Sequence, residues 1–330
     1  MTVEALDYQR FVTVAALSAF FTAISLGIAV FYARNRRQAM VAAVVITTVL
    51  LLEEVSLNSI YMVYGMALAL AAMVIFPLLG TLVRSNQSLG GVFQVTGLIF
   101  ANRVAYYPFS EKYFSLPGAL PGLYLLTFLA CVAFIVAKRL DPKEVGITRG
   151  TTPLRSQLLL SLPVGIASGA VEYLLLRPPP LTFRGDPIQS MLYVIVVMLL
   201  FVGVTEELLF RGLFQSFLAT TLPAWIAVHI SSILFGLMHI GWQNITEVLF
   251  AYFMGLIFGF TYLGFRSLVA PILIHGIGNI VMFQLASAGN ASLPVTFSLL
   301  AFSTPLAGIG LLRSKRYLFA GLGRAPSKTK

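Results

Sequence analysis

Long apolar segments follow one another along almost the whole chain, and only short polar stretches separate them. A helix that crosses a bilayer needs roughly 20 mostly apolar residues. About 11 segments meet this requirement, and they lie at residues 11–32, 39–58, 60–82, 89–107, 119–137, 157–176, 189–210, 222–239, 245–264, 268–287 and 294–312. The pattern predicts an all-α polytopic membrane protein, a helical bundle of about 11 transmembrane helices, with a count of ten as the alternative.

The scarcity of charge supports this prediction. Charged residues make up only 10% of the 330 residues and hydrophobic residues 58%, whereas about a quarter of a soluble domain is charged. Because so few charged side chains cannot cover a water-exposed surface, most of the exterior must face lipid. The basic residues lie in short loops rather than on a polar domain, which argues against nucleic acid as a partner. The lipid bilayer is therefore the first partner that we expect.

The loops also predict organisation and orientation. The longest polar stretch between apolar segments, residues 138–157, divides the chain into an N-terminal transmembrane module at residues 1–140, whose role is unknown, and a second module at 141–320. A basic cytoplasmic tail follows at residues 321–330. Since Lys and Arg concentrate in cytoplasmic loops, their distribution predicts an external N-terminus and a cytoplasmic C-terminus, and we expect the plasma membrane of a prokaryote.

Ionisable residues are rare within the N-terminal apolar segments, where they comprise Glu53, Glu54 and Arg103. A charge at membrane depth is costly, but a long side chain near a helix end can extend to the headgroups. We expect all three to do so, with a polar contact inside the membrane as the alternative.

The C-terminal half contains three polar motifs on three successive apolar segments. The first is EELLFRG, in which Glu207 and Arg211 are four residues apart and therefore share a helix face. Glu206 lies about 100° around the helix and need not be neutralised by that arginine. The pair alone is equally consistent with a structural salt bridge near the membrane surface.

The other two motifs contribute histidines. FGLMH places Phe235 four residues before His239, and HGIGN places His275 and Asn279 on one helix face. Each motif has a structural explanation: an interfacial histidine, or polar contacts between helices. Together the three supply what a water-activating site needs, because a carboxylate can take a proton from water while donors stabilise the resulting oxyanion.

In order and in helical context, these motifs resemble EExxxR, FxxxH and HxxxN of the CPBP family, the CAAX proteases and bacteriocin-processing enzymes. The likeness covers roughly residues 157–312 and implies an intramembrane glutamic endopeptidase, similar to the type II CAAX prenyl endopeptidase. It implies Glu206 as the general base, His239 as its assistant, and His275 and Asn279 as the oxyanion hole.

The same resemblance gives supporting roles to three further residues, Glu207, Arg211 and Phe235, of which the first two would hold the helix and tune Glu206. It implies a peptide or protein substrate, with a lipidated C-terminal tail as one candidate, and no cofactor or metal. Zinc is the minority alternative, because His and Glu are ordinary zinc ligands.

Two other classes of function stay open at this point. The first is a non-catalytic membrane binding or immunity protein that keeps the fold. The second is a proton-coupled transporter that uses Glu206 and the histidines as a relay.

Overall fold

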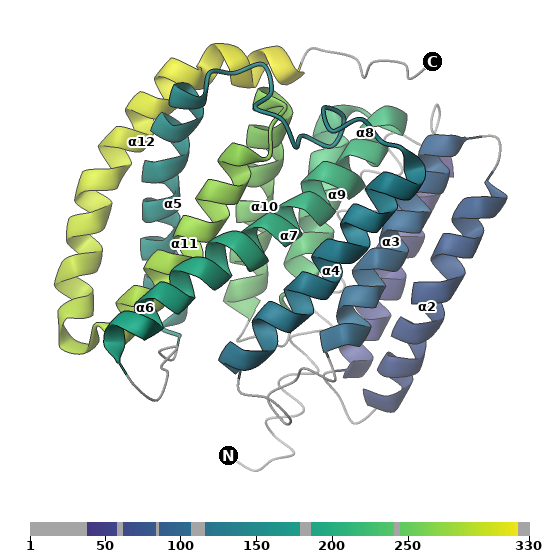
Figure 1. Cartoon of the computed structure of the whole chain (residues 1–330), viewed down its shortest axis with the longest axis horizontal. Coiled ribbons are helices and arrows are strands. Elements are labelled where there is room, and N and C mark those ends of the chain that lie inside the picture. The colour runs from purple at the N-terminus through teal and green to yellow at the C-terminus, as the bar shows by residue number, and fades with distance from the viewer. Residues whose placement is uncertain are drawn as a thin grey trace. The chain divides into compact units, whose positions relative to one another are not determined.

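The computed structural model describes residues 38–57, 62–83, 86–106, 116–178, 186–240 and 245–322. These residues form helices with short connections and, within the described ranges, no strand (Figure 1). The chain is thus an all-α polytopic membrane protein, as predicted. The predicted first span at residues 11–32 and most of the predicted tail lie outside the described residues.

Almost all the predicted segments are helices. The N-terminal ones are Gln38–Leu57, α2 (Met62–Leu82), α3 (Gln87–Tyr106) and α4 (Leu116–Lys138). The others are α5 (Leu154–Leu176), α6 (Pro187–Val196), η1 (Val197–Gly203), α7 (Val204–Glu207), η2 (Leu208–Gln215), α8 (Ser216–Thr221), α9 (Ala224–Leu237), α10 (Ile245–Phe265), α11 (Val269–Ser287), η3 (Gly289–Ala291) and α12 (Ser292–Leu322). Among the described residues, 8 helices are long and apolar enough to cross a membrane. The count of about 11 stays a prediction.

The chain divides into two compact units that interleave along the sequence. The first unit comprises Met1–Val104, Phe214–Leu256 and Ala325–Lys330, and the second comprises Ala105–Leu213 and Ile257–Arg324. The EELLFRG and HGIGN motifs thus lie in the second unit, and the FGLMH motif lies in the first. The predicted division of the chain near residue 140 stays a prediction.

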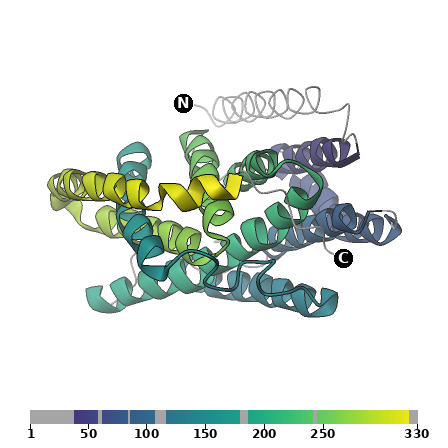
Figure 2. The ribbon, with the colours of Figure 1, turned by 90° about the horizontal axis from the view of Figure 1, so that it is seen from above.

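Close packing of α11 against its neighbours organises the second unit. α11 lies against α5, and α12 lies beside α5 in turn (Figures 1 and 2). A Cβ atom added at Gly169 of α5 would lie 2.2 Å from the carbonyl oxygen of Gly278 on α11. At Gly276, one residue after His275, it would lie 2.9 Å from Cα of Leu199 in η1. Small residues therefore let the backbones approach closely, as is common between membrane helices.

The helices from α6 to α8 form one apolar stretch of 35 residues, Pro187–Thr221. It begins with Asp186 as N-cap, whose side chain accepts a hydrogen bond from Ile188 N at 2.8 Å, followed by proline at the first helical position. Two segments within it, η1 and η2, are π-helical. Such turns are rare and often lie at functional sites. Here they flank α7, the single α-helical turn that carries both glutamates of EELLFRG.

A buried ion-pair cluster joins two helices of the first unit. Arg103 of α3 pairs with Glu54 through Nη2, and its Nε lies 3.6 Å from Glu53 Oε1. Both glutamate side chains are 0% exposed. The expectation that these residues reach the headgroups is therefore wrong, and the alternative holds. The two helices pack their polar residues against each other, so one guanidinium serves both carboxylates inside the unit.

Arg103→Ala should strongly destabilise the folded protein, because it leaves the two buried carboxylates without this guanidinium. Breaking a buried ion pair costs about 3 to 5 kcal/mol. Denaturant titration of the purified protein in detergent, with helix content as the readout, measures the loss. A triple replacement by apolar residues of similar size (Glu53→Leu, Glu54→Leu, Arg103→Met) should restore most of it. Equal stability of Arg103→Ala and the wild type would show that the cluster contributes nothing.

Candidate active site

Glu207 and Arg211 form a buried ion pair at the bottom of the site in the second unit. Arg211 Nη1 lies 3.1 Å from Glu207 Oε1, and both side chains are 0% exposed. The spacing of four residues predicted this pair. A buried guanidinium needs a carboxylate at hydrogen-bonding distance, since neither charge is tolerated alone in an apolar interior.

The same carboxylate oxygen fixes the orientation of His275 on α11. His275 Nδ1 lies 2.9 Å from Glu207 Oε1. A carboxylate beside an arginine only accepts hydrogen bonds, so Nδ1 carries the hydrogen. His275 Nε2 then faces Glu206, whose Oε2 lies 3.7 Å away. In a neutral ring this nitrogen is an acceptor, and it becomes a donor only when the ring is protonated.

An aromatic ring packs between the two basic groups. Phe258 of α10 stacks on His275 with ring centroids 5.0 Å apart and planes 16° from parallel. Arg211 Cζ lies 5.1 Å from the centroid of the same ring. Because the face of an aromatic ring carries negative partial charge, Phe258 favours cationic neighbours.

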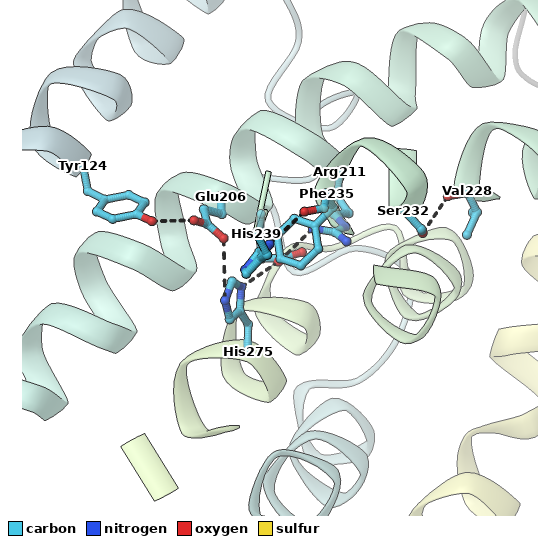
Figure 3. A network of polar contacts seen from close by, with 9 residues as sticks. Tyr124, Glu206, Arg211, Val228, Ser232, Phe235, His239 and His275 are labelled. Atoms are coloured by element: carbon cyan, nitrogen blue, oxygen red, sulfur yellow. Dashed lines mark hydrogen bonds and ion pairs between the residues drawn. The ribbon is translucent and has the colours of Figure 1, made fainter. Parts of the chain in front are cut away.

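Glu206 has a different environment from the adjacent Glu207. Its side chain is 17% exposed, and its Oε1 accepts a hydrogen bond of 2.5 Å from the hydroxyl of Tyr124 on α4. Figure 3 shows Tyr124, Glu206 and His275 joined in this order. The buried Oε2 makes no hydrogen bond within the described ranges. As predicted from the helix geometry, Arg211 pairs with Glu207 and not with Glu206.

Tyr124 is the contact that the sequence analysis missed. It lies in an otherwise apolar helix and far from the three motifs. No spacing rule connects it to Glu206, 82 positions later in the chain. Asn279, in contrast, is where the motif predicted it, one turn after His275 on α11 and partly buried.

His239 and Phe235 lie in the first unit, and their placement relative to Glu206 stays a prediction. His239 follows the end of α9, and its Nδ1 lies 2.8 Å from the carbonyl oxygen of Phe235. The two rings are 4.8 Å apart. A helix leaves its last carbonyls without partners, so the spacing of four lets His239 satisfy one of them. Since a carbonyl only accepts, Nδ1 is the donor and Nε2 is an acceptor in the neutral ring.

The His, Cys, Asp and Glu side chains bear on the question of a metal. Among the parts of the chain that the structure describes, no group of three or more His, Cys, Asp or Glu side chains could hold a metal ion. Glu207 Oε1 is already shared by Arg211 and His275. The expected absence of a cofactor and the zinc alternative both stay predictions.

Comparisons with known proteins agree with the motif analysis. A family model described as type II CAAX prenyl endopeptidase Rce1-like matches residues 188–281, a range that contains all three motifs. The predicted resemblance to the CAAX proteases is therefore confirmed. Neither the search of curated proteins nor the search of solved structures found a match.

The two glutamates should respond differently to an isosteric change. Glu207→Gln removes the counterion of the fully buried Arg211 and should cost about 3 kcal/mol or more of folding free energy. Glu206→Gln weakens one hydrogen bond and should cost about 1 kcal/mol or less. Denaturant titration of both variants in the same detergent checks this difference. Equal losses would mean that Arg211 depends on neither carboxylate in particular.

Proposed function

Because residues 188–281 match the Rce1-like family of CAAX proteases, a group of hydrolases, we propose that this integral membrane protein is an intramembrane glutamic endopeptidase. Its substrate is a peptide or protein, and we propose a lipidated C-terminal tail as the preferred class. The observation that carries the proposal is the asymmetry of the adjacent carboxylates. Arg211 and His275 Nδ1 both bind Glu207, while Glu206 is partly exposed and its Oε2 makes no hydrogen bond within the described ranges.

In the proposed mechanism Glu206 is the general base. Glu206 Oε2 and His275 Nε2 lie 3.7 Å apart, and we propose that they separate to admit the attacking water, to which each atom can then hydrogen-bond. Glu206 takes one proton from that water, and the oxygen bonds to the carbonyl carbon of the substrate. The protonated Glu206 then gives the proton to the leaving nitrogen as the C–N bond breaks, which yields an acid and an amine.

The negative oxygen that forms on the attacked carbonyl needs donors. We assign this role to Asn279, through its amide, and to the protonated ring of His275, through Nε2–H. His239 assists Glu206 through Nε2, which the hydrogen bond from Nδ1 to Phe235 leaves as the acceptor in the neutral ring.

The proposed topology has an external N-terminus and a cytoplasmic C-terminus in a prokaryotic plasma membrane. It is supported by the basic loops and by the run of basic residues after residue 312. Under this topology Glu206 lies near the cytoplasmic end of the predicted span at residues 189–210. The site is then accessible to the C-terminal tails of cytoplasmic or membrane-bound proteins.

Cleavage of quenched-fluorescent peptides, with and without a prenylated C-terminal cysteine, tests the proposed activity. The purified wild type should cleave, and Glu206→Gln should lower kcat by about 10²- to 10⁴-fold, the contribution of a general base. Glu172→Gln is the matched control, since it changes a glutamate of α5 outside the site, and it should retain activity.

Other results of this assay would favour a different base, a different mechanism or a different function. Activity retained by Glu206→Gln would remove that residue as the base. Loss of activity on chelation, with recovery on added zinc, would favour a metalloprotease. A folded wild type that cleaves no peptide would favour the binding or transport alternatives.

Cysteine labelling tests the topology. Thr2→Cys and Ser327→Cys are placed separately in a Cys131→Ala background, because Cys131 is the single, buried cysteine. In intact cells a membrane-impermeant maleimide should label the cysteine at position 2. The cysteine at position 327 should react only after permeabilisation. The reverse pattern would overturn the orientation, and labelling of both in intact cells would indicate an even number of spans.

A further inference from the structure

We propose that Tyr124 is a positioning residue that keeps Glu206 ionised and so places the proton shared by Glu206 and His275 on the histidine. This inference rests on the proposed function, because it concerns the protonation of its general base. It assigns a role to α4, a helix outside the residues that the family model matches.

Two contacts hold Tyr124 at the glutamate. Its hydroxyl donates to Glu206 Oε1 at 2.5 Å, and its backbone carbonyl accepts a hydrogen bond of 3.3 Å from the hydroxyl of Thr205. Thr205 and Glu206 are consecutive on α7, so the two bonds fix both the depth and the rotation of α4 against the catalytic turn.

Apolar packing also holds α4 in this position against its neighbouring helices. Leu120 of α4, one turn before Tyr124, is buried in a cluster with residues of α6 and η1, and the Tyr124 side chain packs against this cluster. The other members are Val194, Val197, Met198 and Val202. A tyrosine hydroxyl held in this way cannot move away from Glu206 without disturbing the cluster.

The charges around Glu206 explain why a donor matters here. Within its unit, Glu206 contacts Tyr124 from α4 and His275 from α11, and Arg211 on its own helical stretch is close enough to interact with its charge. Arg211 balances Glu207. The remaining pair, Glu206 and His275, is neutral overall in two ways: as carboxylate with imidazolium, or as carboxylic acid with neutral imidazole.

The hydrogen bond from Tyr124 stabilises one of these two forms more than the other. A hydrogen bond to an ionised acceptor is roughly twice as strong as one to a neutral acceptor, so a hydroxyl fixed at Oε1 favours the carboxylate. The proton then resides on His275, where Phe258 and Glu207 also favour a cation. Carboxylate and imidazolium are the states that the proposed base and oxyanion donor require.

Tyr124→Phe tests the proposal with a minimal change of shape. We expect kcat for the fluorescent peptide to fall about 10- to 100-fold, the value of one hydrogen bond to a charged group, while KM is unchanged. The kcat–pH profile should also differ from that of the wild type, because the hydrogen bond that favours the carboxylate is gone. Tyr173→Phe is the matched control, since it removes a buried 2.7 Å hydrogen bond to Ser292 in the same unit; it should change neither kcat nor the profile.

Infrared difference spectra read the protonation of Glu206 without any substrate. The difference between wild type and Glu206→Gln at neutral pH should contain a carboxylate band. The same difference in the Tyr124→Phe background should instead contain a protonated carboxyl band.

An active wild type whose Tyr124→Phe variant keeps kcat, pH profile and carboxylate band would overturn the role of Tyr124 while the proposed function stands. A wild type that cleaves no peptide would overturn the proposed function. In that case the infrared bands alone decide whether Tyr124 controls the proton: a shift to the protonated carboxyl supports it, and an unchanged carboxylate overturns it.

Discussion

A single carboxylate oxygen, Glu207 Oε1, organises the chemistry of this protein. It accepts from Arg211 at 3.1 Å and from His275 Nδ1 at 2.9 Å, in a position that is fully buried. Arg211 is the counterion of this carboxylate, and a carboxylate only accepts hydrogen bonds, so the hydrogen between Glu207 and His275 lies on Nδ1. The ion pair of Glu207 and Arg211, on the far side of the histidine, therefore determines that Nε2, the nitrogen facing Glu206, is the one without hydrogen in the neutral ring.

Two consecutive glutamates can serve opposite purposes because of helix geometry. Neighbouring positions differ by about 100° around the axis, so Glu207 faces Arg211 and α11 while Glu206 faces α4. The close approach of α11 at Gly276 brings His275 within reach of both. The flanking π-helical segments alter the register on either side of α7, and the turn that carries the two glutamates keeps α-helical geometry between them.

Features that depend on local spacing were predictable from the sequence, and features that depend on tertiary approach were not. The pair Glu207–Arg211 follows from a separation of four residues, and the helices follow from apolar length. Arg103 lies about fifty residues after Glu53 and Glu54, so nothing local indicated that the three would meet in a buried cluster rather than extend to the headgroups. The contact of Tyr124 with Glu206 could not be predicted for the same reason, since no sequence spacing links an isolated tyrosine in an apolar helix to its partner.

The two motif histidines show how a backbone or side-chain acceptor assigns a role to an imidazole. Both use Nδ1 as the donor, His239 to the carbonyl of Phe235 and His275 to the carboxylate of Glu207. A neutral carbonyl orients the ring and leaves Nε2 as an acceptor in the neutral form. A carboxylate orients the ring equally well but also stabilises its charged form, in which Nε2 donates. The roles that we propose for the two histidines, a proton acceptor in one motif and an oxyanion donor in the other, are consistent with this difference in charge of the partner at Nδ1.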